Sequence, residues 1–163
     1  SIDGTRPVIS NDGWEMVETD IIAIHNYAHG ASWDVAQHKR YEQGLSCRDA
    51  LIGQPSTYRP IFVEGYADGG QPLLLTEMGG VSFGKRDGEC FGYSDVKTED
   101  DLIVFLRRVF KSIYASSAIK GFCYTQFSDV EQEINGLVTE DRKPKADKEV
   151  IAKIVKGEDY SGN

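Results

Sequence analysis

The sequence predicts an α/β protein built on a parallel sheet, and three observations point to that class. Four short apolar runs are nearly continuous rather than alternating, which is typical of strands buried on both faces. Segments with helical periodicity lie between these runs, so strands and helices alternate along the chain. Each run also ends in a cluster of polar, acidic or aromatic residues. In a parallel sheet, ligands usually bind at this carboxyl end of the strands.

The predicted strands are separated by Gly and Pro residues, which mark the connecting loops. A closed (β/α)8 barrel usually needs about 250 residues. The pattern alone therefore fits either a small open sheet or a piece of a larger fold. The four strands are expected at Pro7–Ser10, Ile21–Ile24, Leu73–Thr76 and Ile119–Thr125.

The clearest predicted helix runs from Asp101 to Ala118, where apolar residues recur every three or four positions. Thr98 lies three residues before Asp101 and is expected to cap the first turn. The other predicted helices are Ser32–Arg40, Arg48–Ile52 and Asp147–Lys156, the last ending before Gly157.

The composition is that of an ordinary globular domain, with 40% hydrophobic and 27% charged residues. The formal net charge is −8, and no cluster of Lys and Arg is present to bind an anionic surface. No apolar run approaches the roughly 20 residues needed to span a bilayer. We therefore expect no nucleic-acid partner and no membrane partner.

The chain has three cysteines, Cys47, Cys90 and Cys123, which are far apart and form no CxxC pair. An odd, scattered set favours a reducing compartment and hence a cytoplasmic protein. The N-terminus opens directly into polar sequence, without the pattern of a signal peptide.

The three histidines raise the question of a metal site, because His25 and His29 are four residues apart and His38 follows. Four-residue spacing suits a helix face, but this segment follows a predicted strand and contains Gly30. We therefore expect no metal site and no cofactor.

Polar clusters follow the predicted strands at residues 11–15, 25–27, 76–80 and 124–129. Carboxylates and amides bind hydroxyl groups, and aromatic faces stack on pyranose rings, so four such strand ends predict a carbohydrate site. The candidate substrate-binding residues are Asp12, Trp14, His25, Tyr124, Gln126 and Asp129.

Glu77 follows Leu73–Thr76 directly, which places a carboxylate at the mouth of a buried strand. A carboxylate in such a place loses solvation, so it has either a functional role or a partner in a structural salt bridge. Gly79 and Gly80 come next and permit a tight turn with close backbone approach.

Four segments resemble the catalytic barrel of glycoside hydrolase family 2, and the likeness runs from about Asp3 to Lys145, nearly the whole chain. That family includes β-galactosidases, β-glucuronidases and β-mannosidases. The segments occur in the expected order and are Thr5–Glu15, Ile24–Tyr27, Pro72–Gly80 and Gly136–Lys145.

The resemblance implies that the four strands are the fifth to eighth of a TIM barrel. Residues 1–163 would then be a single partial domain, the C-terminal half of that barrel. Glu77 matches the nucleophile at the end of the seventh strand, and Tyr27 matches the tyrosine that hydrogen-bonds to it. Tyr124 stands where the eighth strand usually carries a tryptophan under the sugar.

The acid/base residue of the family is a glutamate that follows an asparagine at the end of the fourth strand. The chain has no Asn-Glu dipeptide, so this residue is expected in the missing half of the barrel. The resemblance implies a retaining mechanism that needs both carboxylates. We therefore expect the isolated chain to be an inactive fragment.

β-Glucuronidases carry an Asn-x-Lys before the glycine that matches Gly136, whereas this chain has Glu133 and Asn135. The resemblance then favours neutral β-linked hexosides, as in a β-galactosidase. The expected partners are a carbohydrate substrate, the missing barrel half and sandwich domains, and a second copy at the open strand edges. The alternative is a non-catalytic carbohydrate-binding or interaction module with the same architecture.

Overall fold

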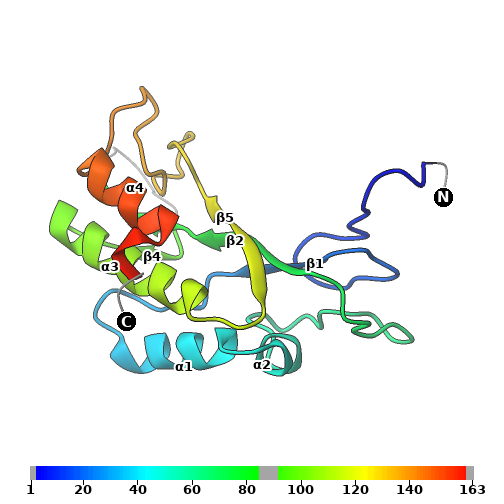
Figure 1. The fold of residues 1–163 in the computed structure, drawn as a ribbon. Coiled ribbons are helices and arrows are strands. Elements are labelled where there is room, and N and C mark those ends of the chain that lie inside the picture. The colour runs from blue at the N-terminus through cyan, green and yellow to red at the C-terminus, as the bar shows by residue number, and fades with distance from the viewer. Residues whose placement is uncertain (1–2, 85–91, 161–163) are drawn as a thin grey trace.

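The computed structural model describes residues 3–84 and 92–160. Its central sheet has three parallel strands in the spatial order β1–β2–β5, which confirms the α/β class with a parallel sheet. The strands are β1 (Ile22–Asn26), β2 (Leu73–Gly79) and β5 (Ile119–Thr125) (Figure 1). A separate parallel pair is formed by β3 (Val81–Ser82) and β4 (Ser94–Asp95).

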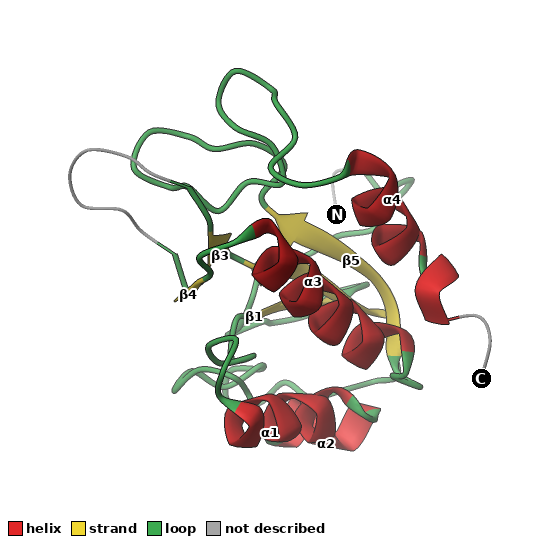
Figure 2. Cartoon of the chain, turned by 90° about the vertical axis from the view of Figure 1, so that its left-hand side faces the viewer, coloured by secondary structure: helices red, strands yellow, loops and turns green. Residues whose placement is uncertain are grey.

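The helices lie on one side of the sheet. Figures 1 and 2 show α3 and α4 side by side over the strands, with α1 and α2 along the lower edge. None of the helices in the described part of the chain is long and apolar enough to cross a membrane. Their bounds are α1 (Val35–Leu45), α2 (Arg48–Gly53), α3 (Glu99–Tyr114), α4 (Lys148–Lys156) and the 3-10 turn η1 (Glu158–Tyr160).

Helix α3 is capped by Thr98, as the sequence predicts, but it begins at Glu99, two residues before the predicted start at Asp101. The Thr98 hydroxyl accepts the Asp101 amide at 3.1 Å, and the Asp101 carboxylate accepts the Thr98 amide at 3.2 Å, which completes a capping box. The helix ends at Tyr114, earlier than predicted, because the Ser116 hydroxyl accepts the amides of Ala118 and Ile119 and turns the chain into β5.

Helix α1 starts and ends later than predicted. Asp34 caps it by accepting the Gln37 amide at 2.9 Å, so Ser32 lies outside the helix. The apolar spacing continues through Tyr41 to Leu45, and these buried side chains carry the helix past Arg40.

The first predicted strand, Pro7–Ser10, is wrong. This segment extends away from the helices, and Val8 and Ile9 are 48% and 40% exposed. The Val8 main chain instead pairs with Asp20, whose carboxylate accepts the Val8 amide and whose own amide donates to the Val8 carbonyl. With no neighbouring strand to pair with, the apolar run stays irregular. The prediction of four parallel strands is corrected to three within the described main sheet.

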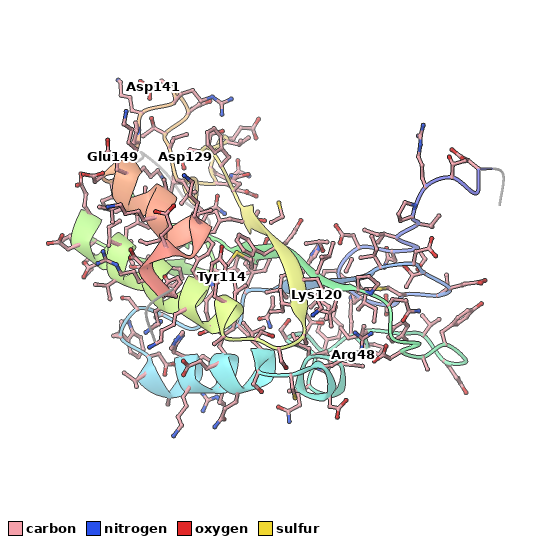
Figure 3. All side chains as sticks on the ribbon, viewed as in Figure 1. Arg48, Tyr114, Lys120, Asp129, Asp141 and Glu149 are labelled. Atoms are coloured by element: carbon pink, nitrogen blue, oxygen red, sulfur yellow. The ribbon has the colours of Figure 1, made fainter. Side chains whose placement is uncertain are left out.

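The core lies between the helices and the sheet. Burying each large apolar side chain stabilises the fold by about 1.5–3 kcal/mol relative to leaving it exposed. β5 is an edge strand, and its exposed residues include Lys120, labelled in Figure 3 at the start of the strand. Self-association through that edge stays a prediction. The largest fully buried residues on β2 and α3 are Leu73, Leu75, Met78, Leu102, Phe105, Leu106 and Phe110.

A β-bulge interrupts β2 beside its carboxyl end. Leu75 and Met78 are both fully buried, with two residues between them instead of one. In the pairing with β1, Ile24 lies opposite Leu75 but His25 lies opposite Glu77. Thr76 and Glu77 therefore share the place of one residue, and both side chains reach the rim. The sequence interpretation placed Glu77 after the strand, whereas it lies within β2.

Candidate active site

Glu77 and Tyr27 meet at the carboxyl edge of the sheet. The Tyr27 hydroxyl donates to Oε2 of Glu77 at 2.8 Å, and the Glu77 side chain is 38% exposed. Burial raises the pKa of Tyr27 above its usual range, and the Glu77 carboxylate raises it further. The phenol therefore keeps its proton and acts as the donor.

His25 lies between two carboxylates. Its Nδ1 is 3.2 Å from Oε2 of Glu77, and its Nε2 is 3.3 Å from Oδ2 of Asp12. The Thr76 hydroxyl donates to Oδ1 of Asp12 at 2.5 Å. These contacts join the N-terminal loop, β1 and the bulge of β2 into one polar cluster.

The loop at residues 11–15 lies directly against His25. Gly13 donates its amide to the Ala23 carbonyl at 3.1 Å and has φ 94°, a conformation that favours glycine. A Cβ at this position would lie 2.9 Å from the His25 ring. The Trp14 ring meets the same imidazole edge-on, with centroids 5.1 Å apart. Two sequence-predicted residues, Asp12 and Trp14, are therefore brought to Glu77 through His25.

A hollow of about 280 Å³ opens beside this cluster, near the lower end of the usual range for ligand pockets. Tyr93 stacks on Tyr27 with ring centroids 3.7 Å apart, which gives the hollow an aromatic wall. Its lining residues are Trp14, His25, Tyr27, Ala28, Ser56, Thr57 and Tyr93. Such a surface can hold a ring with hydroxyl groups.

Sequence reasoning missed Ser56, Thr57 and Tyr93. The first two lie in the loop between α2 and β2, and the Ser56 hydroxyl donates to the His25 carbonyl at 2.8 Å. Hydroxyl residues in a loop are too common to mark a site, and Tyr93 follows no apolar run. No signal in the sequence distinguishes these three.

Asp129 does not face the cluster, which corrects its assignment as a substrate-binding residue. It forms a buried ion pair with Lys145 at 2.7 Å, and its Oδ1 accepts the Gly136 amide at 2.8 Å. Lys145 also donates to the Ile134 carbonyl at 2.7 Å, and burial lowers its pKa although Asp129 opposes that shift. Figure 3 shows Asp129 in the loop beyond β5. Its polar groups are used to hold that loop together.

Tyr124 lies on the helix side of β5, which corrects its expected place under the sugar. Its ring is parallel to that of Phe110 at 6.0 Å, and Phe122, two residues earlier, contacts the same phenylalanine. Side chains two apart in a strand share a face, so Tyr124 points into the core. Gln126 donates its side-chain amide to Asn135 at 2.9 Å, within the loop that follows β5.

No group of three His, Cys, Asp or Glu residues in the described ranges is arranged to hold a metal ion. His29 and His38 lie beneath the rim, where His29 meets the rings of Tyr41 and Phe105 edge-on. Burial, with Arg108 and His29 nearby, lowers the pKa of His38 to about 4. Cys90 lies outside the described residues.

No protein-family model matches the sequence, and no curated protein matches it. Solved structures do. A GH2 β-galacturonidase from Eisenbergiella tayi is 19% identical with a TM-score of 0.51, over 85% of this chain and 24% of that one. The β-glucuronidase of Bifidobacterium dentium is 19% identical with a TM-score of 0.51, over 88% of this chain and 21% of that one.

A β-glucuronidase from Ruminococcus gnavus matches with a TM-score of 0.54 and 17% identity, over 89% of this chain and 22% of that one. At the level of fold, the chain is similar to GH2 glycosidases. It spans between a fifth and a quarter of the length of these three proteins. The similarity to GH2 glycosidases concerns the fold and assigns no role to any side chain.

Proposed function

We propose that this chain carries the nucleophile half of the active site of a retaining β-glycosidase, with Glu77 as the nucleophile. The observation that supports it is the 2.8 Å hydrogen bond from Tyr27 to Glu77 at the carboxyl edge of the parallel sheet. The fold shared with GH2 glycosidases also supports the proposal, because this edge is where barrel enzymes bind substrate.

In this mechanism, a Glu77 carboxylate oxygen attacks the anomeric carbon and forms a glycosyl ester. The glycosidic C–O bond breaks, and its electron pair and an acid proton go to the leaving oxygen. Water then attacks the anomeric carbon, loses a proton to the base and releases Glu77 as a carboxylate. The Tyr27 hydroxyl stabilises the charge that returns to Glu77.

The acid/base group is proposed to come from residues beyond this chain, in the first half of the barrel. Retaining glycosidases place their two carboxyl groups about 5–5.5 Å apart, and the chain has no Asn-Glu dipeptide to supply the second. Acid/base assistance typically contributes about 10²–10⁴-fold in rate. The chain by itself is therefore expected to leave a nitrophenyl hexoside uncleaved.

The proposed substrate is a neutral β-hexoside. Burial raises the pKa of Tyr93, and the nearby Glu77 and Glu133 carboxylates raise it further. Arg59 lies over the Trp14 ring, but it is paired with Glu15 at 2.7 Å. Within the described residues, a uronate would meet more negative than positive charge at this rim.

Covalent trapping tests the nucleophile. The reagent is a 2-deoxy-2-fluoro-β-hexosyl fluoride, whose activated leaving group needs little acid assistance. It is applied to the full-length natural polypeptide that contains these residues. Peptide mass spectrometry is expected to locate one fluoroglycosyl adduct on Glu77, and Glu77→Gln is expected to abolish it. An adduct on another residue, or binding by calorimetry with neither adduct nor turnover, would favour the carbohydrate-binding module instead.

A panel of nitrophenyl glycosides tests the substrate class. We expect kcat/KM for a β-galactoside or β-glucoside to exceed that for the β-glucuronide. A preference for the glucuronide would show that the acidic rim does not decide specificity.

A further inference from the structure

The two oxygens of the Glu77 carboxylate have different surroundings. Tyr27 Oη at 2.8 Å and His25 Nδ1 at 3.2 Å both face Oε2. Within residues 3–84 and 92–160, no hydrogen bond or ion pair reaches Oε1. The described part of the chain therefore holds one oxygen and leaves the other without a contact.

The His25 ring is fixed from several directions. Asp12 lies 3.3 Å from Nε2 without forming a hydrogen bond to it, the Trp14 ring abuts the edge of the imidazole, and the absence of a side chain at Gly13 lets the loop approach the ring. The His25 carbonyl is also fastened by the Ser56 hydroxyl. A ring confined in this way has few alternative rotamers and keeps Nδ1 directed at Glu77.

Asp12 connects this ring to the bulge. Its second oxygen accepts the hydroxyl of Thr76, the residue that precedes Glu77. Asp12 thus contacts both the imidazole of β1 and the segment of β2 that carries the carboxylate. Its side chain is 55% exposed, so solvent weakens its Coulomb interaction and its geometric effect matters more.

We infer that Asp12 and His25 are positioning residues for Glu77, which hold Oε2 so that Oε1 is the oxygen presented to the anomeric carbon. The inference rests on the proposed function and deepens it by assigning different tasks to the two oxygens. It also replaces the expectation that Asp12 and His25 bind sugar hydroxyls directly. A misplacement of about 1 Å at a reacting group can cost about 100-fold in rate.

The test measures the inactivation rate constant and the dissociation constant of the fluoroglycosyl fluoride separately, in the full-length polypeptide. Asp12→Asn and His25→Leu are expected to lower the inactivation rate constant about 10–100-fold, with the dissociation constant unchanged. His25→Asn keeps an N–H near the Nδ1 position and is expected to recover part of the rate. Glu18→Gln is the matched control, because it removes a negative charge from an exposed position in the same N-terminal segment.

A second measurement tests the contacts without any reaction. Long-range ¹H–¹⁵N spectra of the chain report the two ring nitrogens of His25. Asp12→Asn is expected to shift mainly Nε2, and Glu77→Gln mainly Nδ1, whereas Glu18→Gln leaves both in place.

The outcomes separate the two proposals. If the unsubstituted protein reacts at Glu77 but Asp12→Asn and His25→Leu react equally fast, the positioning role is overturned while the nucleophile stands. If these variants change only the dissociation constant, they bind sugar and the positioning role is again overturned. If the spectra show the contacts but Glu77 never reacts, it is the glycosidase proposal that fails.

Discussion

Two regions of this chain look alike in sequence and differ in structure. At the end of β2, Glu77 projects toward Tyr27 and His25, which come from a different strand and loop. After β5, Asp129 is paired with Lys145 and accepts a main-chain amide within a single loop region. A polar residue after an apolar strand is therefore an incomplete signal. The two regions differ in how their carboxylates are bonded: that of Asp129 is buried and bonded within its own loop region, whereas that of Glu77 remains partly exposed to solvent.

Removing Lys145 tests the closed region and has the largest expected effect. Lys145→Met leaves Asp129 buried without its partner, which for a buried ion pair costs about 3–5 kcal/mol. Urea unfolding followed by circular dichroism measures the loss. Lys143→Met is the control, since Lys143 pairs with Asp141 in the exposed part of the same segment and little change is expected. Equal losses in the two variants would contradict the structural role of Asp129.

Tyr27→Phe tests the open region. A hydrogen bond to a charged group is worth about 1.5–3 kcal/mol, so fluoroglycosyl labelling of Glu77 should slow about 10–100-fold. Tyr114→Phe also deletes one hydroxyl, which joins α3 to α4 by donating to the Val155 carbonyl. The control should lower the unfolding free energy and leave the labelling rate unchanged. Slowing of labelling by both variants would mean that the rate follows overall stability.

Gly13→Ala probes how the N-terminal loop meets His25. The positive φ alone costs about 1–3 kcal/mol, and the new Cβ would also press on the imidazole. Gly65→Ala is matched, with φ 90° and open space around the position. Gly13→Ala should lower the thermal midpoint more than Gly65→Ala does, and it should also shift the NMR resonances of His25. Identical behaviour of the two variants would show that the loop does not fix the ring.

The smallest effect is expected beneath the rim, at His38. Its pKa of about 4 lies below the ordinary value near 6.5, so the unfolded chain binds the extra proton first. The stability that depends on neutral His38 is complete above pH 6.5 and is lost as the pH falls toward 4. When the pH is lowered from 7 to 4.5, the thermal midpoint of the His38→Gln variant should fall by about 2–4 °C less than that of the unsubstituted protein. An unchanged slope would place the acid sensitivity elsewhere.

Much of the sheet is predictable from the chain because β1, β2 and β5 each contain a largely apolar run, although β5, at the edge of the sheet, is only partly buried. Thr98 and Gly157 mark helix ends because their side-chain and backbone chemistry acts locally. Pro7–Ser10 misleads because a strand also needs a neighbour, and pairing depends on residues far away in sequence. Local patterns cannot reveal that the neighbour is absent.

The site is predictable only in part. Glu77, Tyr27 and His25 meet because parallel strands deliver their ends to one edge, whereas Asp12 and Trp14 reach the same place on a loop that is bonded to β1 through Gly13. The prediction for Tyr124 is wrong because side chains alternate between the two faces of β5, and the sequence does not show which of these side chains face the core. The prediction for Asp129 is wrong because its partner, Lys145, lies beyond a long loop, and the strand pattern gives no information about that loop.

The extra residue in β2 separates two requirements that a strand normally couples. Leu75 and Met78 keep the same buried side, while the pair between them faces outward together. Deleting Thr76 would restore the two-residue alternation, with Glu77 alone facing outward between Leu75 and Met78, and would remove the hydroxyl that donates to Asp12. Two apolar residues three positions apart, with a hydroxyl and an acidic residue between them, are thus a pattern worth searching for in other chains. The pattern marks a β-bulge that brings two polar side chains to the same edge of a sheet.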